Sequence, residues 1–177
     1  MFRILTGLLL TVLLGLTGCS HYRMGTGVEA RFDTLFIPPV TNEANLPQAI
    51  ALVTTEVRET FLRDGRVRLV ASEDEADAVL RINLVDYRRD RLVSQPADTG
   101  LARKFGMILT ADCTLTLAGE DKPLFENRRF VAERQLFTDG NAAGAPFDGQ
   151  LQAQYQNLPL LAETLAAQLK SAALDVW

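Results

Sequence analysis

The chain has 177 residues, 47% of them hydrophobic and 23% charged, so it can bury one core and is not intrinsically disordered. Its net charge of −4 excludes general nucleic-acid binding, because phosphate contacts need clustered cations. It has two cysteines, Cys19 and Cys113, and if the first carries lipid, a disulfide framework within the chain is excluded as well.

Residues 1–18 have the pattern of a cleaved secretory signal. Arg3 gives a short positive region, and the apolar run from Ile4 to Leu16 is shorter than the ~20 residues that cross a bilayer as a helix. The run ends in Leu16-Thr17-Gly18-Cys19, which resembles the bacterial lipobox. We therefore predict cleavage before Cys19, diacylglyceryl on its thiol and an N-acyl chain, which together would hold the protein at a membrane.

Residues 19–33 are predicted to form the lipidated N-terminus and a short tether, and residues 34–177 a single domain. Thr34 to Val40 is typical of a strand that ends at Pro38-Pro39, since proline cannot donate to a ladder. Pro47 to Arg63 predicts an amphipathic helix, with Asp64-Gly65 as its stop. Its apolar residues recur at spacings of three and four: Leu46, Ile50, Val53, Val57 and Phe61.

Four further strands and one turn are expected next. A short strand runs from Val67 to Val70, and Ser72 to Glu75 has the spacing of a capping box and predicts one helical turn. Ala78 to Asp90 and Met107 to Leu117 alternate apolar and polar residues, as half-buried strands do. Leu124 to Leu136 returns as another strand. Cys113 falls on the apolar face, where a free cysteine behaves as a small hydrophobe.

Thr138 to Asn157 has no apolar period and is predicted to be a loop, followed by a second amphipathic helix from Leu158 to Val176. Two such helices can bury their apolar stripes by lying on one face of a sheet. The other face is then semi-polar. Its polar residues are Arg81, Asn83, Thr110, Thr114 and Thr116.

Nothing in the sequence singles out a catalytic or metal centre, so we expect a protein that is not an enzyme and has no metal or cofactor beyond its lipid. The single histidine, His21, lies two residues from Cys19, which leaves no nucleophile–base arrangement or zinc cluster in the domain. Carboxylates are plentiful, but no pair stands out for acid–base hydrolysis, which stays the least favoured alternative.

One group of cations does stand out. Arg88, Arg89 and Arg91 leave one predicted strand, and Arg103 and Lys104 enter the next. If the two strands form a hairpin, five cations gather at one end of an acidic domain, and arginine forks suit phosphate or carboxylate groups. The alternative is a set of solvated charges on a loop.

A weaker second pair of cations is Arg128 and Arg129. Both belong to the predicted strand that begins at Leu124.

From Cys19 onward the chain resembles the lipopolysaccharide-assembly lipoprotein family LptE, formerly called rare lipoprotein B. The resemblance rests on phrases in order: the lipobox cysteine, residues 36–42 (FIPPVTN), residues 61–70 (FLRDGRVRLV), residues 76–80 (ADAVL) and Asp86-Tyr87. It implies an α+β fold with two helices on one face of a roughly four-stranded, mostly antiparallel sheet. It also implies a partner, the outer-membrane β-barrel LptD, which the protein plugs and helps to assemble while lipopolysaccharide reaches the outer leaflet. By charge, Arg88, Arg89, Arg91, Arg103 and Lys104 are the candidate lipopolysaccharide contacts.

The alternative is another lipid-anchored periplasmic adaptor, such as a peptidoglycan-synthase activator or a secretion-channel subunit. About a dozen residues separate Cys19 from the first strand, a reach of at most ~40 Å, so the domain stays near its membrane and the barrel role is favoured. Ser20 after the cysteine favours the outer membrane in proteobacteria. The expected location is therefore the cell outer membrane, on its periplasmic side or within the barrel lumen.

Overall fold

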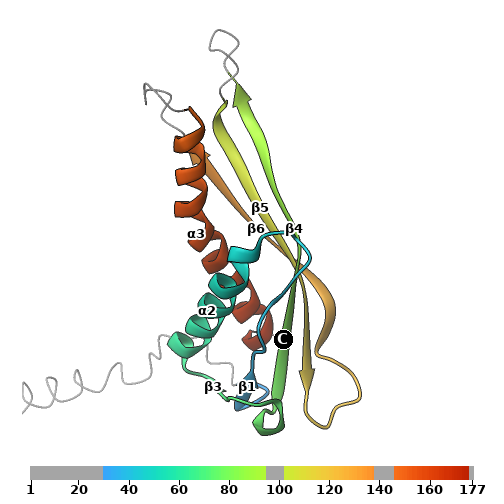
Figure 1. The fold of residues 1–177 in the computed structure, drawn as a ribbon. Helices are drawn as coiled ribbons and strands as arrows, with labels where there is room; N and C mark the ends of the chain where they lie inside the picture. Colours follow the sequence, from blue (N-terminus) through green and yellow to red (C-terminus); the bar gives the residue numbers. More distant parts are fainter. Residues whose placement is uncertain (1–29, 95–101, 138–145, 176–177) are drawn as a thin grey trace, which may run out of the picture.

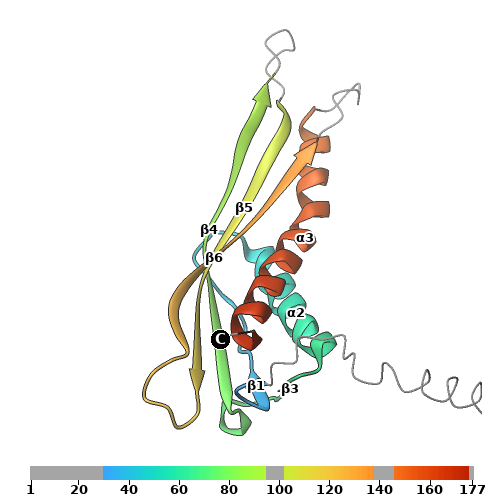
Figure 2. The same ribbon diagram turned by 180° about the vertical axis from the view of Figure 1, so that it is seen from behind.

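The protein is built from two layers, a twisted sheet and two helices that cover one of its faces (Figures 1 and 2). The computed structural model describes residues 30–94, 102–137 and 146–175. The helices are α2 (Pro47–Asp64) and α3 (Pro146–Leu174), which pack against each other and against the sheet. The predicted α+β class, with both helices on one face, is confirmed.

Within the described residues the sheet has six strands and is mixed, so the prediction of about four mostly antiparallel strands is only partly correct. The long strands β4 (Ala78–Ser94), β5 (Ala102–Leu117) and β6 (Phe125–Phe137) pair antiparallel. The short strands pair in parallel, and they are β1 (Thr34–Phe36), β2 (Thr41–Asn42) and β3 (Arg68–Leu69). Parallel neighbours need a crossover connection, which α2 supplies between β1 and β3.

The strand predicted from Thr34 to Val40 is interrupted. It ends at Phe36, and the chain returns to the same edge of β4 at Thr41 as β2. Pro38 and Pro39 lie in the gap, because proline has no N–H to donate to a neighbouring strand.

Helix α2 agrees with its prediction and ends one residue later, at Asp64. Gly65 follows in the left-handed conformation, with a φ of 73°, and its N–H donates to the carbonyl of Phe61 at 3.1 Å. The buried face is slightly rotated from the expected one, since Ala49 is fully buried and Ile50 only partly.

The helical turn predicted at Ser72 to Glu75 is confirmed and is the 3₁₀ helix η1 (Glu73–Glu75). The Ser72 side chain makes no capping hydrogen bond. The Glu73 carboxylate instead accepts a hydrogen bond from Arg81 at 2.6 Å, across to β4.

The loop predicted from Thr138 to Asn157 is wrong in its second half, because α3 already begins at Pro146. Residues 138–145 lie outside the described residues. The first turns of α3 carry no clear apolar stripe, and Tyr155, in the part with described side chains, is 57% exposed. Without an apolar period in the sequence, this part could not be told from a loop.

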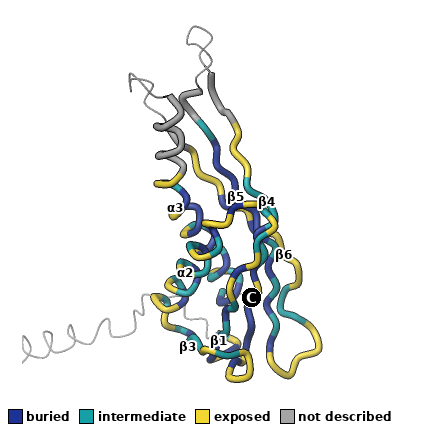
Figure 3. Tube along the Cα trace, viewed as in Figure 1, coloured by how far each residue is buried: buried dark blue, intermediate teal, exposed yellow. Residues whose placement is uncertain are grey.

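The alternation predicted for β4 and β5 is confirmed, and Figure 3 shows the buried residues following these strands through the middle of the sheet. The residues that face the helices are buried, namely Ala78, Leu80, Ile82 and Leu84 on β4 and Met107, Leu109, Ala111, Cys113, Leu115 and Leu117 on β5. A register shift between Leu84 and Asp86 then moves β4 by one residue against β5. Between this shift and Asp90, odd-numbered residues of β4 face the helices and even-numbered residues face outward.

Arg66 joins the carboxyl ends of the two helices. Its Nε donates to Asp64 at 2.6 Å, and its Nη1 donates to Asp175 at 2.8 Å. Lys170 Nζ lies 3.3 Å from the same Asp64 carboxylate. The hydrogen bonds from Arg66 hold the pKa of both carboxyls below their usual range.

We expect Arg66→Ala to lower the free energy of unfolding by about 1–2 kcal/mol, since a partly solvated, charged hydrogen-bond donor is lost to two carboxylates. The lowered pKa values of Asp64 and Asp175 contribute stability above their unfolded-state pKa of about 4, and this is lost as the pH falls through the folded-state pKa. The variant should therefore lose less stability than the wild type between pH 7 and pH 3. Urea unfolding at both pH values measures this.

The matched control for that experiment is Arg63→Ala. The Arg63 side chain is 62% exposed and pairs with Glu56 on the surface of α2 alone. Its removal should change the unfolding energy by no more than about 0.5 kcal/mol. An Arg66→Ala protein with the wild-type pH dependence would contradict the proposed network.

Candidate functional site

The cations singled out in the sequence lie at one end of the β4–β5 hairpin, beyond the point where β2 stops pairing (Figure 1). Arg88, Arg89 and Arg91 belong to β4, and Arg103 and Lys104 belong to β5. The register places Arg91 opposite Phe105 and Lys104 opposite Val93. The antiparallel pairing of β4 and β5 confirms the predicted hairpin at the level of the backbone. The side chains of Arg91, Arg103 and Lys104, and all of Cys19, lie outside the described residues.

Arg88 and Arg89 do not share a face. Arg88 is opposite Ile108 on the outer face, whereas Arg89 is opposite Met107 on the face that carries the helices. Arg88 also has two carboxylates beside it, since its guanidinium lies 4.0 Å from Asp86 and 3.7 Å from Asp90. The hairpin end therefore carries cations on both faces, and the Arg88 charge is partly balanced.

The outer face of the sheet is semi-polar, as predicted, and several of its polar side chains pair with one another. Arg129 binds Asp112 through two hydrogen bonds of 2.8 Å, which hold the pKa of the carboxyl below its usual range. Thr41 donates to Asn83 at 2.9 Å, and Asn83 donates to Glu43 at 3.0 Å. A shallow hollow of about 530 Å³ lies over this network. The face offers hydrogen-bonding groups, and its Arg129 and Asp112 charges are paired with each other, whereas the Glu43 carboxylate is held only by the neutral Asn83 amide.

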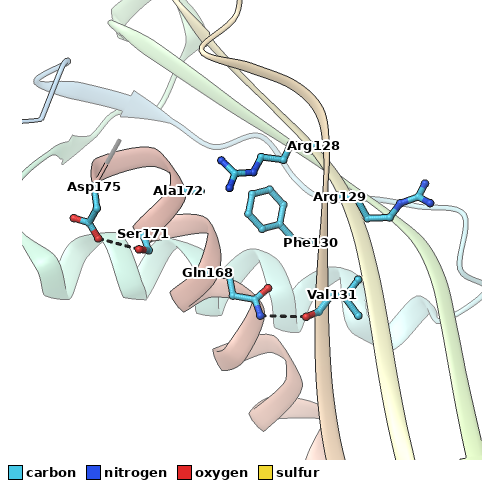
Figure 4. Close-up of a pocket in the computed structure, with 8 residues that line it drawn as sticks. All are labelled: Arg128, Arg129, Phe130, Val131, Gln168, Ser171, Ala172 and Asp175. Atoms are coloured by element: carbon cyan, nitrogen blue, oxygen red, sulfur yellow. Dashed lines mark hydrogen bonds between the residues drawn. The ribbon is translucent and has the colours of Figure 1, made fainter. Parts of the chain in front are cut away.

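The second cationic pair also divides between the two faces (Figure 4). Arg129 points to the outer face and Asp112, while Arg128 points toward α3 and stacks on the rings of Phe125 and Phe130. The pairing is irregular here, and Asn127 has a φ of 45°. No sequence pattern indicates this arrangement, because the facing residues of α3 are about forty positions away along the chain.

Cys113 is fully buried, and burial raises the pKa of its thiol to about 12. A thiol that stays protonated at neutral pH is a weak nucleophile and a poor metal ligand. Among residues 30–94, 102–137 and 146–175, no group of three or more His, Cys, Asp or Glu side chains is placed to hold a metal ion.

The fold and its polar outer face define a class of small α+β domain in which two helices cover one side of a sheet and leave the other open. The sequence matches the family LptE, described as lipopolysaccharide-assembly, over residues 32–173. The chain therefore belongs to the LptE family, as its sequence phrases predict. No curated protein sequence matches it.

Several solved structures align with this chain. A hypothetical protein from Chlamydia trachomatis aligns with a TM-score of 0.54 at 9% identity, over 81% of this chain and 99% of that one. Rare lipoprotein B from Shewanella oneidensis aligns with a TM-score of 0.49 at 18% identity, over 79% and 90%. A minor lipoprotein from Acinetobacter baumannii gives 0.48 at 14% identity, over 80% and 90%. At these identities the likeness concerns the fold alone.

Neither helix of the described chain combines the length and the apolarity that a bilayer-spanning helix needs.

Proposed function

We propose that this LptE-family protein is a non-enzymatic lipoprotein of the outer membrane that plugs the β-barrel LptD, assists its assembly and helps to deliver lipopolysaccharide to the outer leaflet. The observation that carries the proposal is the family match, which spans residues 32–173 and so covers both layers of the fold. The alternative adaptor roles have no comparable support.

The outer face of the sheet supports the plug role. The interior of a large outer-membrane barrel is polar and hydrated. A surface such as the Arg129–Asp112 and Asn83–Glu43 network can meet that interior through hydrogen bonds, and the charges of Arg129 and Asp112 are already paired with each other. An apolar outer face would fit a water-filled lumen poorly.

The anchor is the second part of the proposal. Lipid on Cys19, with the tether formed by residues 19–33, would keep the domain on the periplasmic side of the outer membrane or within the barrel lumen. Its reach of ~40 Å is too short for a domain that acts far from its membrane.

The test is co-purification from outer membranes in mild detergent. We expect the chain to be recovered with a large β-barrel protein, and depletion of the chain to reduce the amount of that barrel that is folded. A chain recovered alone, with the barrel folded normally in its absence, would refute the plug role.

Lipopolysaccharide would meet the hairpin cations Arg88, Arg89, Arg91, Arg103 and Lys104, because arginine forks suit its phosphate groups. We expect the double reversal Arg88→Glu with Arg91→Glu to weaken lipopolysaccharide binding by about tenfold or more at low ionic strength, where such contacts are least screened. The fold should survive, since Arg88 is 60% exposed. Binding is measured over a range of salt concentrations.

The control has the same change of net charge at a different place: Arg63→Glu with Arg68→Glu, both on the exposed surface near the end of α2. It should bind lipopolysaccharide as the wild type does. Equal affinity of the hairpin variant and the wild type at low salt would remove the hairpin from the proposed binding surface.

A further inference from the structure

A groove of about 750 Å³ lies between β6 and the last turns of α3, which is within the usual size range of small-molecule sites (Figure 4). Arg128, Phe130 and Val131 line it from β6, and Gln168, Ser171 and Ala172 line it from α3. The Gln168 Nε2 donates to the carbonyl of Val131 at 3.1 Å and joins the helix to the strand at one end of the groove.

Arg128 brings an unbalanced positive charge to this groove. Its Cζ lies 5.8 Å from the ring centroid of Phe125 and 5.3 Å from that of Phe130. Among the described residues it forms no ion pair, whereas Arg129 beside it is fully engaged with Asp112. A guanidinium stacked on aromatic rings keeps its in-plane N–H donors available to an anion.

The one carboxylate that lines the groove does not cancel this charge. Asp175 lies at the far end of α3, where it accepts hydrogen bonds from Arg66 at 2.8 Å and from Ser171 at 3.0 Å. Its charge is therefore balanced by Arg66. The rest of the lining is mixed, because Gln168 and Ser171 are polar, whereas the Phe130 ring and the Ala172 side chain form an apolar part between strand and helix.

We propose that this groove binds a small amphipathic anion, whose phosphate or carboxylate group pairs with Arg128 while its apolar chain lies along Phe130 and Ala172. The site is separate from the hairpin cations. Arg128 is opposite Cys113 of β5, and Arg91 of the hairpin is opposite Phe105 of the same strand. These two β5 positions are eight residues apart. The groove thus adds a second ligand site, distinct from the lipopolysaccharide contact proposed above.

The test is photolabelling of the mature lipidated chain, in neutral maltoside detergent, with a decyl phosphate that carries a diazirine on its alkyl chain. We expect saturable labelling of peptides from β6 and from the end of α3. Unlabelled decyl phosphate or decanoate should compete, and the stronger competitor identifies the preferred head group. Inorganic phosphate should compete poorly, because it lacks the apolar chain.

Arg128→Gln should raise the half-saturating concentration by about tenfold or more, the effect of losing one charged hydrogen-bonding partner. Arg128→Lys should restore part of the affinity. The matched control is Arg134→Gln, an exposed arginine on the same strand that does not line the groove, and it should label as the wild type does. All variants should unfold at the wild-type urea concentration.

Wild-type labelling in Arg128→Gln would overturn the proposal, as would inorganic phosphate competing as well as decyl phosphate. Labelling that appears on the β4–β5 hairpin, and disappears in the Arg88→Glu, Arg91→Glu protein, would overturn the groove while leaving the proposed function standing. Failure of the barrel co-purification would refute the proposed function while leaving the groove proposal standing.

Discussion

Changing Phe61 to alanine should lower the free energy of unfolding by about 3–5 kcal/mol, the usual cost of emptying a fully buried aromatic site. Phe61 lies in the last turn of α2, has no exposed surface and is the largest of the fully buried side chains. Its loss would leave a cavity beneath the turn that Gly65 caps. Urea unfolding followed by circular dichroism measures the change.

Leu62→Ala is the control for this prediction. Leu62 is the next residue of the same helix and is 61% exposed, so its truncation should change stability by no more than about 0.5 kcal/mol. Comparing Phe61→Ala with Leu62→Ala separates the loss of buried surface from any effect of alanine on helix propensity. Similar losses in the two variants would show that the site of Phe61 is not the packed core described above.

The largest effect on function is expected at Cys19. In Cys19→Ala the thiol that receives the diacylglyceryl group is gone, so the precursor should keep residues 1–18 and carry no acyl chains. Mature wild type should instead begin at an acylated Cys19. Intact-mass spectrometry and incorporation of labelled palmitate distinguish these products, and the variant should fail to support barrel assembly.

Cys113→Ala is the matched control. The Cys113 thiol is buried and its pKa is raised to about 12, so it should remain unmodified in the wild type, and its loss should leave acylation and processing unchanged. A mature wild-type protein with a free Cys19 thiol, or with residues 1–18 still attached, would contradict the anchor and the location that depends on it.

The elements that were predictable from the sequence are those with one buried and one exposed face. Half burial imposes a period of 3.6 on α2 and of two on β4 and β5, and these periods can be read without a structure. β2 is two residues long and cannot display a period, so it was not predicted as a separate strand. β3 lies within the strand predicted from Val67 to Val70, but its parallel partner is distant in the chain and was not predicted. The first turns of α3 escaped prediction because they show no apolar stripe.

The cationic hairpin was predictable because two alternating segments joined by a short connection usually pair. The face of the sheet on which each arginine lies could not be predicted. The register shift between Leu84 and Asp86 decides it by turning Arg88 outward and Arg89 toward the helices. The groove at Arg128 could not be predicted from the sequence either, because it depends on the packing of α3 against β6.

The hydrogen bond from Gln168 to Val131 bears on how the edge of the sheet is protected from pairing with other chains. β6 is the last strand on its side of the sheet, and a bare outer strand invites copies of a chain to join edge to edge and aggregate. Here the Gln168 side chain of α3 already donates a hydrogen bond to the backbone carbonyl of Val131 on this edge strand. This edge strand is thereby partly protected from pairing with a second copy of the chain.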